Sequence, residues 1–98
     1  MKGVFIVTRV YAIISTYMSN PDAEIDPITY SSREKAIAYL YSLCDKYNAW
    51  CRKSSYPEQR TRMYKVDETD GTIYYKYLNS ANRVCRIVET WIKELEVE

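Results

Sequence analysis

The chain has 98 residues, a formal net charge of +1 and a hydrophobic fraction of 47%. This length and composition predict one folded domain, residues 1–98, and exclude a disordered chain. The weak net charge also excludes a strong general attraction to nucleic acid or to a membrane surface.

Residues 4–14 (VFIVTRVYAII) are rich in β-branched and aromatic side chains, which predicts a central or near-central strand. The run begins like a signal peptide, but Arg9 interrupts it too early and no small-residue cleavage site follows. No apolar run of the sequence has membrane-spanning length. We therefore expect a cytoplasmic protein.

Residues 15–27 are polar, and the prolines at Asn20-Pro21-Asp22 and at Asp26-Pro27 predict turns. Residues 28–30 (ITY) form a short strand candidate, which we expect to pair with the first strand as a hairpin with a long loop.

The clearest helix signal begins at Ser31, which forms a capping box with Glu34 three residues later. Apolar side chains then recur at three- and four-residue steps, which predicts an amphipathic helix from about Ser32 to about Arg52. The predicted stripe is Ala36, Ile37, Leu40, Leu43, Cys44, Tyr47 and Trp50.

Residues 61–67 and 72–78 (TIYYKYL) flank a turn at residues 68–71 and predict a second hairpin, with Gly71 at positive φ. Residues 83–96 fit one face of a strand (Cys85, Ile87, Trp91) or of a helix, and their β-branched content favours the strand. The predicted class is α+β, an antiparallel sheet of about four strands with one long amphipathic helix on one face. The predicted core is Phe5, Ile6 or Val7, Val10, Ala36, Leu40, Leu43, Tyr47, Ile73, Ile87 and Trp91.

The strand Val4–Thr8 and the helix start Tyr30-Ser31-Ser32-Arg33-Glu34-Lys35-Ala36 resemble a pattern found in small uncharacterised phage and bacterial proteins. The resemblance covers about the first 40 residues, and the later hairpin agrees with it. It implies a bacterial or phage origin, and it implies no activity, because that group has no agreed catalytic residues.

The residue types that carry most catalysis are missing or badly spaced. The chain has no histidine, so a serine or cysteine nucleophile would lack its usual base, and two glycines cannot build a phosphate-binding loop. The three cysteines, Cys44, Cys51 and Cys85, form no Cys-x-x-Cys pair, and we interpret Cys44 and Cys51 as small buried hydrophobes. We expect no enzyme activity, catalytic residue, cofactor or metal.

Positive charge alternates with aromatic rings between Arg52 and Tyr77, as in sheets that stack bases and bind phosphates of single-stranded nucleic acid. The candidate nucleic-acid contacts are Arg52, Lys53, Arg60, Arg62, Lys65 and Lys76. The alternative is a solvated loop with tyrosines that pack on the hairpin.

Eleven tyrosines provide the other candidate surface. If the helix covers one face of the sheet, rings on the other face form a composition typical of protein contacts, or they shield the sheet of a monomer. The candidate interface residues are Tyr11, Tyr64, Tyr74, Tyr75 and Trp91. The first hypothesis is therefore a small protein-interaction module, of the adaptor or inhibitor type, with a protein partner or a second copy. Single-stranded nucleic-acid binding is the alternative.

Overall fold

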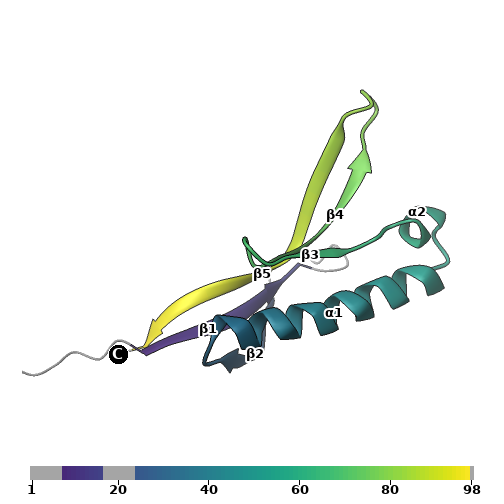
Figure 1. Cartoon of the computed structure of the whole chain (residues 1–98). Helices are drawn as coiled ribbons and strands as arrows, with labels where there is room; N and C mark the ends of the chain where they lie inside the picture. The colour runs from purple at the N-terminus through teal and green to yellow at the C-terminus, as the bar shows by residue number, and fades with distance from the viewer. Residues whose placement is uncertain (1–7, 17–23, 98) are drawn as a thin grey trace, which may run out of the picture.

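The computed structural model describes residues 8–16 and 24–97, which form a curled antiparallel sheet and one main helix (Figure 1). The elements are β1 (Thr8–Ser15), β2 (Glu24–Tyr30), α1 (Arg33–Lys53), α2 (Pro57–Arg60), β3 (Lys65–Asp67), β4 (Thr72–Leu78) and β5 (Val84–Val97). The predicted α+β class is confirmed, and the sheet has five strands rather than about four. None of the described helices is both long and apolar enough to cross a membrane.

The strand order is β2-β1-β5-β4-β3, and all four neighbouring pairs are antiparallel. Both predicted hairpins are confirmed, and so is the strand interpretation of the C-terminal segment, which becomes β5 between the two hairpins. The turn predicted at Asp26-Pro27 is wrong, because both residues belong to β2. An edge strand tolerates proline, since one side of its backbone needs no ladder hydrogen bond.

The residue that caps helix α1 lies one position later than the predicted cap, Ser31. The N-cap is Ser32, whose hydroxyl accepts the backbone N–H of Lys35 at 3.2 Å. The hydroxyl of Ser31 accepts the Nζ of Lys35 instead, so the predicted pairing of Ser31 with Glu34 is wrong. The cap still satisfies one of the free N–H groups of the first turn.

The core lies between α1 and one face of the sheet. The helix buries one stripe of side chains, Ala36, Ile37, Leu40, Cys44, Tyr47 and Cys51. Ile13, Tyr64 and Ile73 meet this stripe from β1, from the segment before β3 and from β4. Of the predicted core, Ala36, Leu40, Tyr47 and Ile73 are buried, and Leu43 packs partly buried against them.

Other positions of the predicted core and of the predicted helix stripe are not fully buried. Val10, Ile87 and Trp91 are only half-buried, and Trp50 at the end of the predicted stripe is 49% exposed. Phe5, Ile6 and Val7, with the start of the predicted first strand, lie outside the described residues.

A β-bulge at Glu89 changes the facing of β5. Ile73 pairs with Thr90 but Tyr74 pairs with Val88, so Glu89 is the extra residue in β5. A bulge of this kind bends its strand and shifts the alternation of side chains by one residue. Glu89 and Thr90 are consequently both buried, and Ile87 and Trp91, predicted on one face, lie on opposite faces.

Candidate interaction site

The hairpin beyond the bulge leaves the rest of the sheet, and we call its residues 75–88 the arm. β3 pairs with β4 only at Thr72–Tyr74, and β1 pairs with β5 only from Thr90 onward. Figure 1 shows the outer halves of β4 and β5 projecting away from α1. Among the described residues, the two strands of the arm pair only with each other.

The tip of the arm is a defined turn. The side-chain oxygen of Asn79 accepts the backbone N–H groups of Ala81 at 2.9 Å and Arg83 at 3.0 Å. Asn82 has φ 58°, a left-handed conformation that asparagine tolerates better than most residues. These contacts hold the register between the strands, so the arm is a closed hairpin and not a loose loop.

Buried polar groups anchor the root of the arm to the core. The Tyr64 hydroxyl donates to the Glu89 carboxylate at 2.8 Å, and the exposed fractions of these residues are 2% and 8%. The hydroxyls of Ser15, Tyr47 and Thr90 lie within 3.1 Å of one another. Burial raises the pKa of Tyr64, and the hydrogen bond to the Glu89 carboxylate raises it further. Each of these polar groups at the root of the arm therefore has a partner, as a stable interior requires.

A ladder of aromatic rings continues from this root onto the arm. Tyr47 and Tyr64 meet edge-on with ring centroids 5.4 Å apart, and Tyr64 and Tyr75 do the same at 5.2 Å. Tyr77 follows at 6.4 Å from Tyr75, and the Arg62 guanidinium lies 4.6 Å from the centroid of the Tyr75 ring. Edge-on pairs and cation–π contacts each add to the stabilisation from burial. Tyr64 and Tyr75 therefore hold the arm in place.

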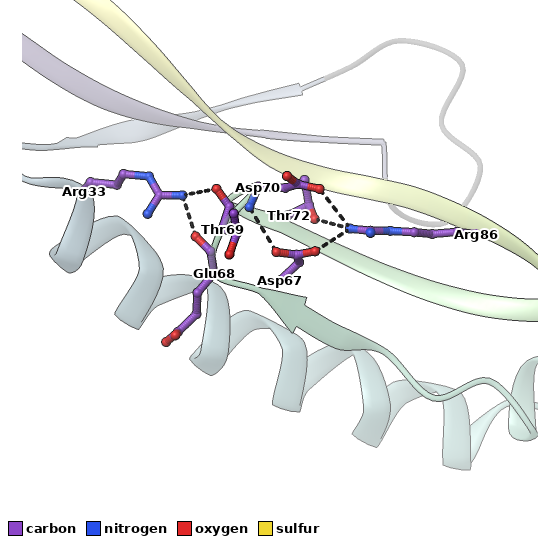
Figure 2. A network of polar contacts seen from close by, with 7 residues as sticks. All are labelled: Arg33, Asp67, Glu68, Thr69, Asp70, Thr72 and Arg86. Atoms are coloured by element: carbon purple, nitrogen blue, oxygen red, sulfur yellow. Dashed lines mark hydrogen bonds and ion pairs between the residues drawn. The ribbon is translucent and has the colours of Figure 1, made fainter.

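A second polar network fixes the turn between β3 and β4 (Figure 2). Arg86 of β5 donates to Asp67 at 3.2 Å and to Thr72 at 3.1 Å, and it forms an ion pair with Asp70 at 3.6 Å. The backbone N–H of Asp70 donates to the Asp67 carboxylate, and this bond, together with Arg86, holds the pKa of Asp67 below its ordinary value. The base of the arm is thus tied to the turn.

Helix α1 reaches the same turn from the other side, where Arg33 donates to the backbone oxygens of Glu68 and Thr69. Gly71 completes the turn with φ +67°. An added Cβ there would lie 3.3 Å from the Cδ1 of Ile92. Glycine is therefore favoured both because it adopts a positive φ readily and because a side chain would crowd Ile92.

The surface of the arm is apolar and basic. Four large hydrophobic side chains are exposed on it, with exposed fractions of 44% for Tyr77, 66% for Leu78, 65% for Val84 and 39% for Val88. Residues 71–88 contain no acid, and their cations are Lys76, Arg83 and Arg86. An exposed apolar surface with one sign of charge is typical of a contact site.

A groove of about 530 Å³ separates the arm from the segment around α2. One wall comes from the arm (Tyr75, Lys76, Tyr77, Leu78 and Ile87), and the other from Glu58, Thr61 and Arg62. A smaller hollow of about 220 Å³ lies on the opposite face of β4, lined by Thr61, Met63, Lys65, Tyr74 and Lys76. Both hollows border β4, the larger one along Tyr75–Leu78 and the smaller one at Tyr74 and Lys76.

The structure does not bring the five predicted interface residues to one face. Tyr64 is buried, and Tyr11 and Tyr75 pack against the core on the helix side. Tyr74 and Trp91 lie on the opposite face, where the Arg86 guanidinium covers the Tyr74 ring at 4.0 Å from its centroid.

The six predicted nucleic-acid contacts are also dispersed. Arg52 and Lys53 end α1, Arg60 ends α2, and only Arg62 and Lys76 line the larger groove. Lys65 lies beside Lys76 at the smaller hollow. All except the half-buried Arg62 are exposed.

The exposed apolar residues of the arm were not predicted from the sequence. Leu78, Val84 and Val88 read as ordinary strand residues, and only their three-dimensional position shows that the main sheet leaves them uncovered. The one signal in the sequence is that large apolar side chains occupy both alternating sets of positions within residues 73–78, and therefore both faces of the strand.

In the ranges 8–16 and 24–97, no group of three or more His, Cys, Asp or Glu residues could hold a metal. Cys44 and Cys51 are buried, in agreement with their interpretation as small hydrophobes, and burial raises the pKa of the Cys44 thiol. No protein-family model, curated protein or solved structure matches this chain.

Proposed function

We propose that this protein is a small protein-interaction module of the adaptor or inhibitor type and that the arm is its contact surface. One observation carries the proposal: in the described part of the chain, both edges of the arm are unpaired while large apolar side chains are exposed on it. An edge strand with free N–H and C=O groups is a template for pairing with another chain.

The free energy available at the arm favours a partner. A two-stranded hairpin alone is marginally stable in water, and natural sheets usually protect their edges. Full burial of a valine or leucine side chain contributes about 1.5–3 kcal/mol. Leu78 and Val84 are both about two-thirds exposed, so most of that contribution is still to be gained on binding.

Single-stranded nucleic acid is the second candidate, supported by the three cations and the absence of acids in residues 71–88. Protein is favoured because bases need free ring faces to stack. Guanidinium groups already cover one face of the Tyr74 ring and one face of the Tyr75 ring, and Arg86 is further engaged by Asp67 and Asp70.

The test compares three forms of the tagged protein: the unchanged chain, an arm variant (Leu78→Ser with Val84→Ser), and a control variant (Tyr41→Ser with Tyr56→Ser). All four positions are exposed, so each variant should fold, which circular dichroism checks. Each form is incubated with a bacterial lysate, since the sequence resemblance implies a bacterial or phage origin. Captured proteins are quantified by mass spectrometry with and without nuclease, and light scattering after size exclusion measures self-association.

We expect the unchanged chain to capture a protein, or to associate with a second copy of itself, whether or not nuclease is present. The control variant should retain this binding, and the arm variant should lose it by about tenfold or more. Equal capture and equal self-association by the arm variant and the unchanged chain would overturn the proposal. Loss of all captured material on nuclease treatment would support the nucleic-acid candidate.

A further inference from the structure

The open edge of β4 at Tyr75–Leu78 has a specific geometry. β3 occupies this side of β4 only as far as Tyr74, and no strand of the described chain continues the pairing. Figure 1 shows β4 diverging from the segment between α2 and β3. Four residues of strand span about 13 Å, which is the length along which a short extended segment would pair.

The two faces of this edge differ in chemistry. Tyr75, Tyr77 and Ile87 lie on the helix side, where they line the larger groove. Lys65 and Lys76 line the smaller hollow on the opposite side together with Met63, and Lys76 also borders the larger groove. Successive side chains of a strand point to opposite faces, so a segment added at this edge would meet the aromatic wall and the lysines in turn.

The charges of the residues that line the two hollows determine which charge a partner segment should carry. Glu58 is the single acid among the residues that line the two hollows, and it lines the larger groove together with Arg62 and Lys76. On the smaller hollow both charged residues are lysines, and both are exposed. Opposite charges across neighbouring strands stabilise pairing, and like charges destabilise it.

From this geometry we infer that the arm binds an extended segment of a partner protein whose side chains alternate between apolar and acidic. The segment pairs with the β4 edge at Tyr75–Leu78, its apolar side chains enter the groove beside Tyr75 and Tyr77, and its carboxylates face Lys65 and Lys76. This inference rests on the proposed function, because it names the chemistry of the partner that the arm would bind.

The test uses three labelled ten-residue peptides and fluorescence anisotropy. The first alternates Glu with Val and Leu, the second alternates Lys with Val and Leu, and the third has the composition of the first with its residues arranged in pairs. The protein variants are Lys65→Glu with Lys76→Glu, and a matched control, Arg52→Glu with Lys53→Glu, which changes the net charge equally at the end of α1.

We expect the unchanged chain to bind the Glu-alternating peptide about tenfold more tightly than the paired arrangement. The Lys65/Lys76 variant should lose that peptide by about tenfold and gain the Lys-alternating one, and the control variant should retain the original preference. Hydrogen exchange should slow at backbone amides within Tyr75–Leu78 when the peptide is bound.

Three results would overturn the inference: equal binding of the alternating and paired peptides, equal losses in both charge-reversed variants, or slowed exchange outside the β4 edge. Displacement of the peptide by oligothymidylate at equal concentration would instead assign the lysines to phosphate. Association of the protein with itself through the same edge would assign the position to a second copy. If the arm variant abolishes protein capture while no peptide binds, the proposed function stands and this inference fails.

Discussion

The most direct test of the arm's anchorage is Tyr64→Phe, which removes one hydroxyl and leaves the ring in place. In the unchanged protein that hydroxyl donates to the Glu89 carboxylate at 2.8 Å in a buried environment. A hydrogen bond to a charged group contributes about 1.5–3 kcal/mol, and its loss leaves the carboxylate without this donor. We expect a loss of about 2 kcal/mol in the free energy of unfolding.

In a domain of this size, 1 kcal/mol changes Tm by about 4–8 °C, so Tm should fall by about 8–16 °C. Thermal unfolding followed by circular dichroism at neutral pH measures the change. The control is Tyr11→Phe, which removes an exposed hydroxyl 3.5 Å from Glu94 and should change Tm little.

The double variant Tyr64→Phe with Glu89→Met separates the hydrogen bond from packing. Replacing both partners by apolar groups of similar shape is often nearly neutral, so the double variant should be more stable than Tyr64→Phe alone. The reasoning is refuted if Tyr64→Phe lowers Tm no more than Tyr11→Phe, or if the double variant is the least stable of the set.

Three further predictions follow from the turn and the buried tyrosines. Gly71→Ala should lower Tm by about 5–10 °C, because an alanine at φ +67° is strained by about 1–2 kcal/mol and its Cβ approaches Ile92; a fall no larger than that of an exposed alanine substitution would contradict this. The lowered pKa of Asp67 means that its stabilisation is present above its unfolded pKa near 4 and is lost as pH falls through the folded value. Asp67→Asn should therefore lower Tm at pH 7 and approach the unchanged protein below about pH 3, and parallel curves of Tm against pH would exclude this role. Burial raises the pKa of Tyr47 and Tyr64, so their contribution is complete below about pH 10 and is lost as pH rises through the folded value. Absorbance at 295 nm should show a late step of tyrosine ionisation at the pH where the circular dichroism signal is lost, and this step should be smaller in Tyr64→Phe. Ionisation of all tyrosines while the chain is still folded would contradict this prediction.

Local patterns in the sequence determine most of the secondary structure. The apolar stripe of α1 and a serine at its start predict the helix to within about one residue, because capping and amphipathic burial act over three or four residues. The β-branched and aromatic content of residues 72–78 and the turn at Gly71 likewise predict the hairpin of β3 and β4. The glycine in this turn predicts the positive φ that the structure has at Gly71.

The tertiary structure alone decided which face each side chain occupies. Glu89 carries no local signal of a bulge, yet its insertion between Val88 and Thr90 buries two consecutive polar residues and places Ile87 and Trp91 on opposite faces. The sequence also left open whether the tyrosines form one surface, and the sheet instead divides them between its faces. The arm depends on where β3 and β1 stop pairing, which is set by register between segments distant in the sequence. Pairing of distant strands, unlike helix capping or turn formation, is a property of the whole sheet. The candidate site therefore depends on the arrangement of all five strands.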